Sequence, residues 1–127
     1  MRMPMTPTSI ENYRLALNRL DRAAYLACFT ADAAVLDPYG PRVLTGVAGL
    51  NKFFDGMERT WTVFQMSFGE TFASADRVAL SWQVEAAAKN GKAARFTGIN
   101  VFTLAEDGLI SRLEGYWDFK AMAAQLQ

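Results

Sequence analysis

The stretch Val78-Ala-Leu-Ser-Trp-Gln-Val-Glu85, followed closely by the dipeptide Asn90-Gly91, decides the fold class of this chain. Every second residue of the stretch is a large apolar one, and the residues between them are small or polar. This period of two is typical of a β-strand with one buried face. Asn-Gly is the strongest short-range signal for a hairpin, because both residues tolerate positive φ. We therefore predict a hairpin that joins this strand to a long strand over about residues 93–104.

Strand signals continue on both sides of this hairpin. Downstream, Glu106-Asp107-Gly108 predicts a second turn, which leads into a strand from Leu109 to Phe119. Upstream, a strand from about Thr62 to Ser74 precedes the first hairpin. Strands joined by short turns pair as antiparallel neighbours. The second half of the chain is therefore expected to form a meander of four long antiparallel strands.

The first half of the chain has the period of helices instead. Apolar residues recur at spacings of three and four from residue 10 onward, which predicts a helix with Thr8 or Ser9 as its N-cap. Asp21 is placed to cap a second, shorter helix that runs to Phe29. A third helix is expected to open at Gly46.

A strand over about residues 33–38 separates the second helix from the third. Pro38 ends this strand, and Val43-Leu44 forms a short return strand. Helices followed by a run of strands indicate an α+β domain. We expect a single domain over residues 1–127, in which three N-terminal helices pack on a strongly curved, mostly antiparallel sheet. Such a sheet leaves a pocket in its concave face. Residues 1–7 are expected to be flexible.

Composition excludes several classes of function. The chain has no histidine and one cysteine, Cys28, which excludes a histidine-dependent triad, a histidine-ligated zinc and an internal disulfide. Thirteen basic and thirteen acidic residues give a net charge of zero, which argues against a nucleic-acid partner. No run reaches the roughly 18 apolar residues of a membrane span. We expect a cytoplasmic protein with no metal and, since it lacks a phosphate-binding glycine loop, no cofactor.

Three polar residues in apolar surroundings are the candidate catalytic groups. Asp37 shares a strand face with Val35, so burial should raise the pKa of its carboxyl group and make it a stronger base; alternatively, Asp37 only begins a turn. Tyr13 lies on the buried stripe of the first helix, where a tyrosine of the core would also lie. Asn100 shares a strand face with Phe102, and its amide must find hydrogen-bond partners, in neighbouring backbone or in a ligand.

Apolar side chains are available to wall a pocket for a small hydrophobic substrate or ligand. Taken singly, each would be ordinary core or dimer surface, and the apolar outer face of an open sheet leads us to expect a homodimer. The residues that we expect to line the pocket are Phe54, Trp61, Trp82, Val84, Phe102 and Trp117.

The segments Tyr13–Asn18 and Phe29–Gly40, with the helix that opens at Gly46, resemble the bacterial ketosteroid isomerases. That family belongs to the nuclear-transport-factor-two-like and polyketide cyclase-like proteins, and the resemblance implies their cone-shaped, cystatin-like fold. In the family, a tyrosine of the first helix and an aspartate before proline are 24 positions apart, as Tyr13 and Asp37 are here.

The resemblance implies a role for each candidate residue. Asp37 corresponds to the general base, Tyr13 to the main oxyanion donor, and Asn100 to a protonated aspartic acid that also donates. Phe54 departs from the family pattern, because a tyrosine that supports the helix-one tyrosine is often found there. The implied reaction is an isomerase-like proton transfer next to the carbonyl group of a small hydrophobic ketone.

Two alternatives remain open, because one fold hosts many functions. A lyase, dehydratase or polyketide-cyclase-like enzyme would use the same pocket for elimination or aldol closure. A non-catalytic module would only bind a hydrophobic ligand. One mark of such a module would be a cavity plugged by Trp82 and Trp117. Another would be an ion pair of Asp37 with Arg42 or Arg112.

Overall fold

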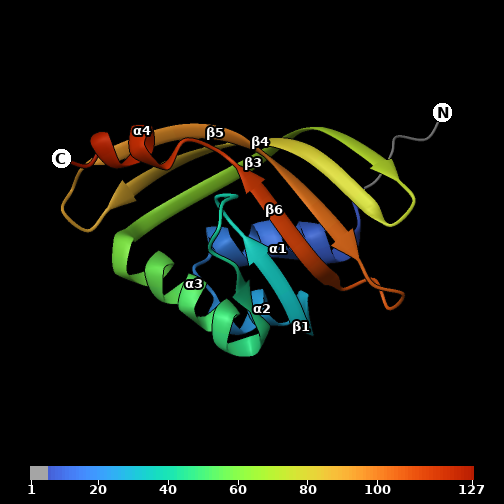
Figure 1. Cartoon of the computed structure of the whole chain (residues 1–127). Coiled ribbons are helices and arrows are strands. Elements are labelled where there is room, and N and C mark those ends of the chain that lie inside the picture. The colour runs from blue at the N-terminus through green and yellow to red at the C-terminus, as the bar shows by residue number, and fades with distance from the viewer. Residues whose placement is uncertain (1–5) are drawn as a thin grey trace.

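Helices dominate the first half of the chain and strands the second. The computed structural model describes residues 6–127, so the flexibility expected for residues 1–7 falls mostly outside the described range. The helices in Figure 1 are α1 (Thr8–Asn18), α2 (Arg22–Leu26), α3 (Gly46–Thr60) and α4 (Phe119–Ala124). The strands are β1 (Phe29–Leu36), β2 (Leu44–Thr45), β3 (Trp61–Ser74), β4 (Arg77–Ala88), β5 (Ala93–Leu104) and β6 (Ile110–Tyr116).

The strands form one six-stranded sheet in the order β2-β1-β6-β5-β4-β3. Strands β3 to β6 pair antiparallel in chain order, which is the predicted meander. In the turn between β4 and β5, Gly91 has a φ of 85° but Asn90 has no positive φ, so the hairpin forms where the sequence predicts it with a different turn from the two-residue Asn-Gly type. β1 pairs antiparallel with β2 but parallel with β6. Figure 1 shows the long strands arching over α1 and α3. The predicted α+β fold with a curved, mostly antiparallel sheet is confirmed.

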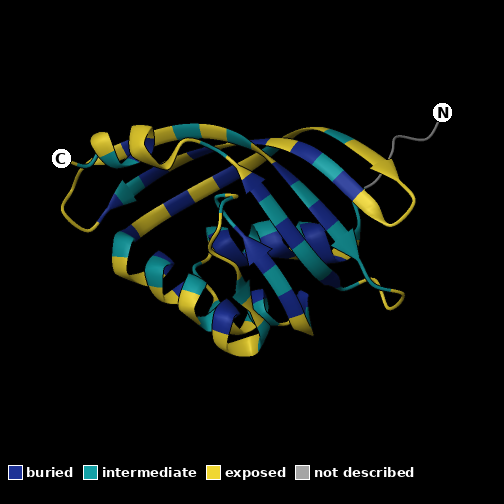
Figure 2. Cartoon of the chain, viewed as in Figure 1, coloured by how far each residue is buried: buried dark blue, intermediate teal, exposed yellow. Residues whose placement is uncertain are grey.

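The hydrophobic core lies between the concave face of the sheet and α1, α2 and α3. Along β4 every second residue from Val78 to Val84 is buried, which confirms the alternation in the sequence. Figure 2 shows the buried positions of the helices and the sheet turned toward one another. The bulkiest fully buried side chains come from both layers and include Tyr13, Tyr25, Phe54, Phe102, Leu50 and Leu80.

The prediction that Thr8 or Ser9 caps α1 is wrong. Pro7 occupies the N-cap position, and no side chain accepts a hydrogen bond there. Ser9 is buried, and its Oγ donates to the carbonyl oxygen of Gly108 at 2.7 Å. The hydroxyl group thus ties α1 to the turn before β6 instead of satisfying the first amides of its own helix.

The second helix is shorter than predicted. Asp21 caps α2 as expected, with Oδ1 accepting from the backbone N–H of Ala24 at 3.1 Å. The helix ends at Leu26, and Phe29 begins β1 opposite Ile110 of β6. The apolar residues up to position 29 fit a helical period, but the non-local pairing with β6 places the last of them in the sheet.

The C-terminal segment also differs from the prediction, which extended the last strand to Phe119. β6 ends at Tyr116, and Phe119 opens helix α4. Asp118 caps this helix, because its Oδ1 accepts from the backbone N–H of Ala121 at 3.0 Å. The Asp118 cap was the local signal for this helix. α4 brings Phe119 and Met122 over the end of the sheet, where both line the cavity described below.

Asn18, the last residue of α1, pairs with the backbone of the edge strand β3. Its Nδ2 donates to the carbonyl oxygen of Met66 at 3.1 Å, and its Oδ1 accepts from the Met66 N–H at 2.7 Å. The Asn18 amide therefore takes the place of a neighbouring strand at Met66, on the edge of the sheet where β3 has no further strand to pair with. This pair of bonds holds α1, and with it Tyr13, against the sheet.

We predict that Asn18→Ala lowers the free energy of unfolding by about 1–3 kcal/mol, because the Met66 N–H loses its partner and the Met66 carbonyl oxygen keeps only the longer bond from Arg14 Nη1, at 3.5 Å. Urea unfolding followed by tryptophan fluorescence measures the change. Asn12→Ala, on an exposed position of the same helix, is the matched control and should change it by less than about 0.5 kcal/mol. Equal effects of the two substitutions would contradict this role of Asn18.

The outer face of the sheet carries exposed apolar side chains. Val63, Phe72, Ile99 and Tyr116 are among the exposed large residues. The homodimer expected from the sequence stays a prediction. No helix within residues 6–127 is long and apolar enough to cross a membrane.

Candidate active site

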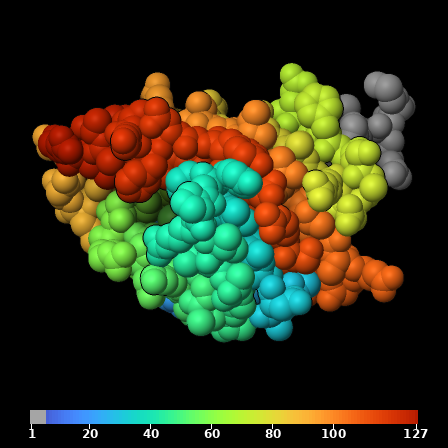
Figure 3. All heavy atoms as spheres, in the orientation of Figure 1, coloured from blue at the N-terminus to red at the C-terminus, as the bar shows by residue number. Residues whose placement is uncertain are grey.

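A cavity of about 510 Å³ opens between the concave face of the sheet, α3 and the C-terminal segment. Tyr13 of α1, Asp37 after β1 and Asn100 of β5 all line it, although they come from distant parts of the chain. The segments 37–44, 52–61 and 117–122 also contribute lining residues. Figure 3 shows parts of these segments bordering one another on one face of the molecule.

Asp37 is placed by the parallel pairing of β1 with β6. Leu36 lies opposite Glu114, so Asp37, the next residue, lies beside Gly115. The indole Nε1 of Trp117 donates to Asp37 Oδ1 at 2.7 Å, which fixes the direction of the carboxylate. The other carboxylate oxygen, Oδ2, accepts no hydrogen bond among residues 6–127. The site therefore holds a carboxylate with one oxygen anchored and one available.

Gly115 is a functional position that the sequence analysis missed. A Cβ at this residue would overlap Oδ1 of Asp37 and would lie 3.1 Å from Oδ1 of Asn100. The absence of a side chain is therefore what allows the carboxylate and the amide to meet over the same strand. A glycine inside a strand is a signal of close approach by another group, and this signal was available in the sequence.

Burial raises the pKa of the Asp37 carboxyl group to about 6, and the hydrogen bond from Trp117 opposes part of this rise. Among residues 6–127, no cation forms an ion pair with Asp37. Arg112, one of the two partners considered from the sequence, pairs with Glu114 at 3.0 Å. Asp37 is half-buried as a whole residue: its carboxylate faces the cavity on one side, and protein atoms surround it on the others. Such a group is a stronger base than an exposed aspartate.

Tyr13 and Asn100 form a buried polar pair beside Asp37. Trp82 Nε1 donates to Asn100 Oδ1 at 2.8 Å. An indole N–H can only donate, so this bond identifies the amide oxygen and leaves Nδ2 to face the Tyr13 hydroxyl group at 3.5 Å. Burial, with the nearby Asp37, raises the pKa of Tyr13 well above its ordinary value. Tyr13 is therefore a neutral donor whose own proton remains free for the cavity.

The structure divides the predicted wall residues into two groups. Trp61, Trp82 and Trp117 line the cavity. Phe54, Val84 and Phe102 do not, because they are completely buried in the core behind it: Phe102 packs edge-on against Tyr13 with ring centroids 5.3 Å apart, and Phe54 packs against Tyr25 at 5.2 Å. The periods of the strands and helices identified which side chains point inward. They did not identify which of those side chains reach the cavity and which lie in the core behind it.

Phe96 is a wall residue that the sequence analysis left out. Its ring stacks on Trp117 with centroids 5.3 Å apart and on Trp61 at 6.1 Å. It also meets Trp82 edge-on at 5.8 Å. Three tryptophans around one phenylalanine make a continuous aromatic wall. Trp82 and Trp117 form part of this wall. They leave the cavity open, whereas in a plugged binding module they would fill it.

Within residues 6–127, no three histidine, cysteine, aspartate or glutamate side chains come together as a metal site would need. Cys28 is buried, its Sγ contacts the Ala24 carbonyl oxygen at 3.2 Å, and burial raises the pKa of its thiol to about 11. A thiol with such a pKa is a poor nucleophile and a poor ligand at neutral pH. Asp37, with its raised pKa, offers acid–base chemistry to the cavity, and Tyr13 and Asn100 offer hydrogen bonds.

We predict that Trp117→Phe raises the pKa of Asp37 above about 6, by about one unit, because the charged carboxylate loses its hydrogen-bond donor. Carbon-13 NMR titration of aspartate-labelled protein measures this pKa. Trp61→Phe is the matched control, since Trp61 lines the same cavity but packs on Phe64 and Phe96. An equal rise in both variants, or none in Trp117→Phe, would show that the indole N–H does not stabilise the charge.

We predict that Asp37→Asn makes the protein more stable at pH 8 and not at pH 4. The folded protein raises the pKa of Asp37 from 3.8 to about 6, so the folded state binds this proton more tightly than the unfolded chain does. The cost in stability therefore builds up between about pH 4 and pH 6, where the unfolded chain ionises first, reaches about 3 kcal/mol above pH 6, and disappears below pH 4. Urea unfolding at the two pH values measures it. A difference between variant and parent that does not depend on pH would contradict the burial of this charge.

Comparison with known proteins agrees with this fold. The family model of the SnoaL-like domain matches residues 10–113. Among curated proteins, no sequence matches the chain. Among solved structures, the epoxide hydrolase/cyclase-like enzyme SalBIII, described for pyran ring formation in the polyether salinomycin, is 24% identical, with a TM-score of 0.77 over 89% of this chain and 90% of that one.

Two other solved structures are similar to the same extent. RV0760c from Mycobacterium tuberculosis, solved in complex with estradiol-17β-hemisuccinate, is 21% identical, with a TM-score of 0.78 over 89% of this chain and 93% of that one. A putative polyketide cyclase from Xanthomonas campestris pv. campestris is 23% identical, with a TM-score of 0.76 over 94% of both chains. These likenesses concern the fold. The family match covers most of the sequence, and the chain belongs to the SnoaL-like family of the nuclear-transport-factor-two-like superfamily.

Proposed function

We propose that this protein is a cofactor-free enzyme that moves a proton next to the carbonyl group of a small hydrophobic ketone. The observation that carries the proposal is the Asp37 carboxylate, which has a raised pKa and no ion pair among the described residues and faces the same apolar cavity as the Tyr13 hydroxyl group. A base with a pKa near 6 is ionised at neutral pH and still basic enough to take a carbon-bound proton.

In the first step, Asp37 removes a proton from the carbon next to the carbonyl group. The electron pair of the broken C–H bond forms the C=C bond of an enolate, and the negative charge moves to oxygen. Tyr13 donates its proton in a hydrogen bond to that oxygen, because the cavity leaves its O–H without another acceptor. When the ketone is β,γ-unsaturated, this intermediate is a dienolate. In the second step, the Asp37 carboxylic acid returns the proton to the γ-carbon, the C=C bond shifts to the α,β-position, the C=O bond re-forms, and the carboxylate is regenerated.

Asn100 supports this oxyanion site in two ways. Its Nδ2 group has two protons, of which one points to the oxygen of Tyr13 and withdraws electron density from the phenol. The second is available to the substrate oxygen. Trp82 holds the amide in this orientation, because its Nε1 donates to Asn100 Oδ1. An amide donates without needing a raised pKa, but its bond strengthens less than that of a carboxylic acid as charge develops on the oxygen.

The second candidate function is ring closure of a polyketide-like substrate. It begins with the same proton removal, but the enolate carbon then attacks a second carbonyl group of the same molecule and forms a C–C bond. The π bond of that carbonyl group breaks, and the resulting alkoxide oxygen takes the proton back from the Asp37 carboxylic acid. The similarity to a putative polyketide cyclase supports this alternative. A third possibility is ligand binding alone, supported by the steroid hemisuccinate bound in a similar structure. All three place a hydrophobic molecule in the same cavity.

We predict that Asp37→Asn lowers turnover of a β,γ-unsaturated ketone by about 10²–10⁴-fold, the usual contribution of a general base. Tyr13→Phe should lower it by about 10²–10³-fold, the usual cost of one oxyanion donor. The absorbance of the conjugated enone product measures turnover. Unaltered turnover in Asp37→Asn would rule out Asp37 as the base.

Exchange of α-hydrogens with deuterated water tests the shared first step apart from the final product. In the presence of the protein, a bound ketone should exchange its α-hydrogens faster, as seen by proton NMR, and Asp37→Asn should abolish the effect. Product analysis with an unsaturated ketone and with an open-chain diketone then separates isomerisation from ring closure. A protein that binds both ketones without accelerating exchange is a binding module.

A further inference from the structure

Four charged residues besides Asp37 line the cavity. Lys52, Asp55 and Arg59 follow one another on α3 at spacings of three and four, so they share one face of that helix. Arg42 comes from the segment between β1 and β2. All four are exposed, whereas the aromatic wall is buried or half-buried, so they form the mouth of the cavity.

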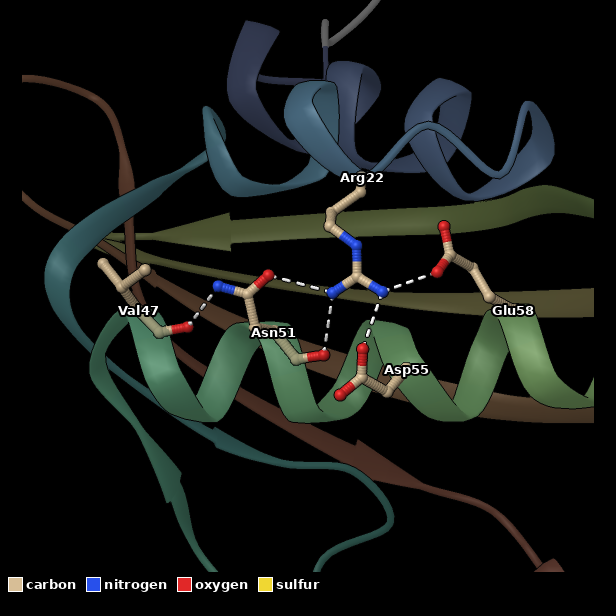
Figure 4. Close-up of polar contacts among 5 residues, drawn as sticks. All are labelled: Arg22, Val47, Asn51, Asp55 and Glu58. Carbon is tan, nitrogen blue, oxygen red and sulfur yellow. Dashed lines mark hydrogen bonds and ion pairs between the residues drawn. The ribbon is translucent and has the colours of Figure 1, made fainter.

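Arg22 of α2 neutralises the acidic residues of α3. Its Nη2 group pairs with Asp55 Oδ1 at 2.7 Å and with Glu58 Oε1 at 2.6 Å. Its Nη1 group donates to the backbone and side-chain oxygens of Asn51 at 3.0 and 2.9 Å. Figure 4 shows this one guanidinium group bound to three residues of α3 that are three or four positions apart, Asn51, Asp55 and Glu58. Asp55, the acidic residue of the mouth, is therefore already compensated by a cation that does not line the cavity.

The cations of the mouth have no such partner. Within residues 6–127, Arg42, Lys52 and Arg59 form no ion pair and no side-chain hydrogen bond. With Asp55 bound to Arg22, the mouth carries three uncompensated positive charges, although the whole chain has a net charge of zero. Cations gathered at the entrance of an apolar cavity attract an anion and orient it.

Gly56 leaves room for a ligand between these cations. It lines the cavity from the middle of α3, where glycine costs about 1 kcal/mol relative to alanine. A Cβ at Gly56 would meet only Nη2 of Arg59, at 3.9 Å. The helix surface between Lys52 and Arg59 is therefore bare, and a ligand can lie flat across it within reach of both side chains.

We propose that the physiological ligand of this cavity is amphiphilic, with an apolar body against the aromatic wall and an anionic group, a carboxylate or a phosphate, held at the mouth by Arg42, Lys52 and Arg59. This inference takes the cavity of the proposed function as its site and adds the substrate class. It concerns binding by side chains other than Asp37, so it can fail or succeed independently of catalysis.

The test compares acids with their methyl esters, which have the same apolar body and no charge. Estradiol hemisuccinate and a smaller naphthylbutanoic acid serve as probes, each against its ester, by isothermal titration calorimetry of the whole protein. We expect each acid to bind about tenfold more tightly than its ester at low ionic strength, and only about twofold at 1 M salt, because exposed charges are screened. An acid that binds no more tightly than its ester, or that does not bind at all, overturns the proposal.

Variants locate the preference. Lys52→Gln with Arg59→Gln should reduce the acid-to-ester ratio to about twofold and leave the affinity for the ester unchanged. The matched control is Arg77→Gln with Arg95→Gln, which makes the same change of net charge at exposed positions of β4 and β5 outside the cavity. An equal loss in both double variants would mean a general effect of net charge, and would overturn the assignment to the mouth.

Arg22→Gln provides an independent test from outside the cavity. Loss of this guanidinium group frees Asp55 and Glu58 beside Lys52 and Arg59, and should lower the acid-to-ester ratio without a direct contact being removed. Estradiol phosphate separates the two possible anions: tighter binding than that of the hemisuccinate at equal salt assigns a phosphate, and weaker binding assigns a carboxylate. If Asp37→Asn abolishes turnover while the acid preference persists, the two proposals are confirmed separately; if turnover survives in Asp37→Asn, only the catalytic proposal fails.

Discussion

The site depends on the parallel pairing of β1 with β6. This pairing joins two strands that are more than 70 residues apart in the chain, and Leu36 of β1 lies opposite Glu114 of β6. It continues beyond β1, where the backbone N–H of Tyr39 donates to the carbonyl oxygen of Gly115 at 2.6 Å. The pairing delivers Asp37 to the bare backbone of Gly115 and within reach of the Trp117 indole. Every other feature of the carboxylate, including its burial, direction and pKa, follows from that position.

The carboxylate is kept in an unfavourable environment by the rest of the fold. The aromatic wall around Phe96 supplies apolar surface near Asp37, and one indole N–H is its polar partner among the described residues. A salt bridge would lower its pKa and weaken it as a base. The cations of the cavity lie at its mouth instead. There they form no ion pairs with Asp55 and Glu58, because Arg22 binds both of these acidic residues. The cavity thus has an apolar interior with one basic group and a positively charged entrance.

The sequence predicted more of the fold than of the site's surroundings. The alternation from Val78 to Val84, the hairpin at Asn90-Gly91 and the opening of α3 at Gly46 are local patterns, and the structure confirms all three. The ends of α2 and β6 were wrong. At Phe29 a distant strand competed with a local helical period, and after Tyr116 the cap at Asp118 was overlooked.

The sequence by itself determined the inward faces of the elements and thereby the candidates Tyr13, Asp37 and Asn100, because side-chain direction follows from the period of a helix or a strand. Only the tertiary structure decided which inward residues reach the cavity. Phe102 and Tyr13 both face inward, yet Phe102 lies behind Tyr13 and outside the lining. Whether an inward side chain reaches the cavity or lies behind its lining depends on the curvature of the sheet and on pairings between distant strands. Neither is encoded in a local sequence pattern.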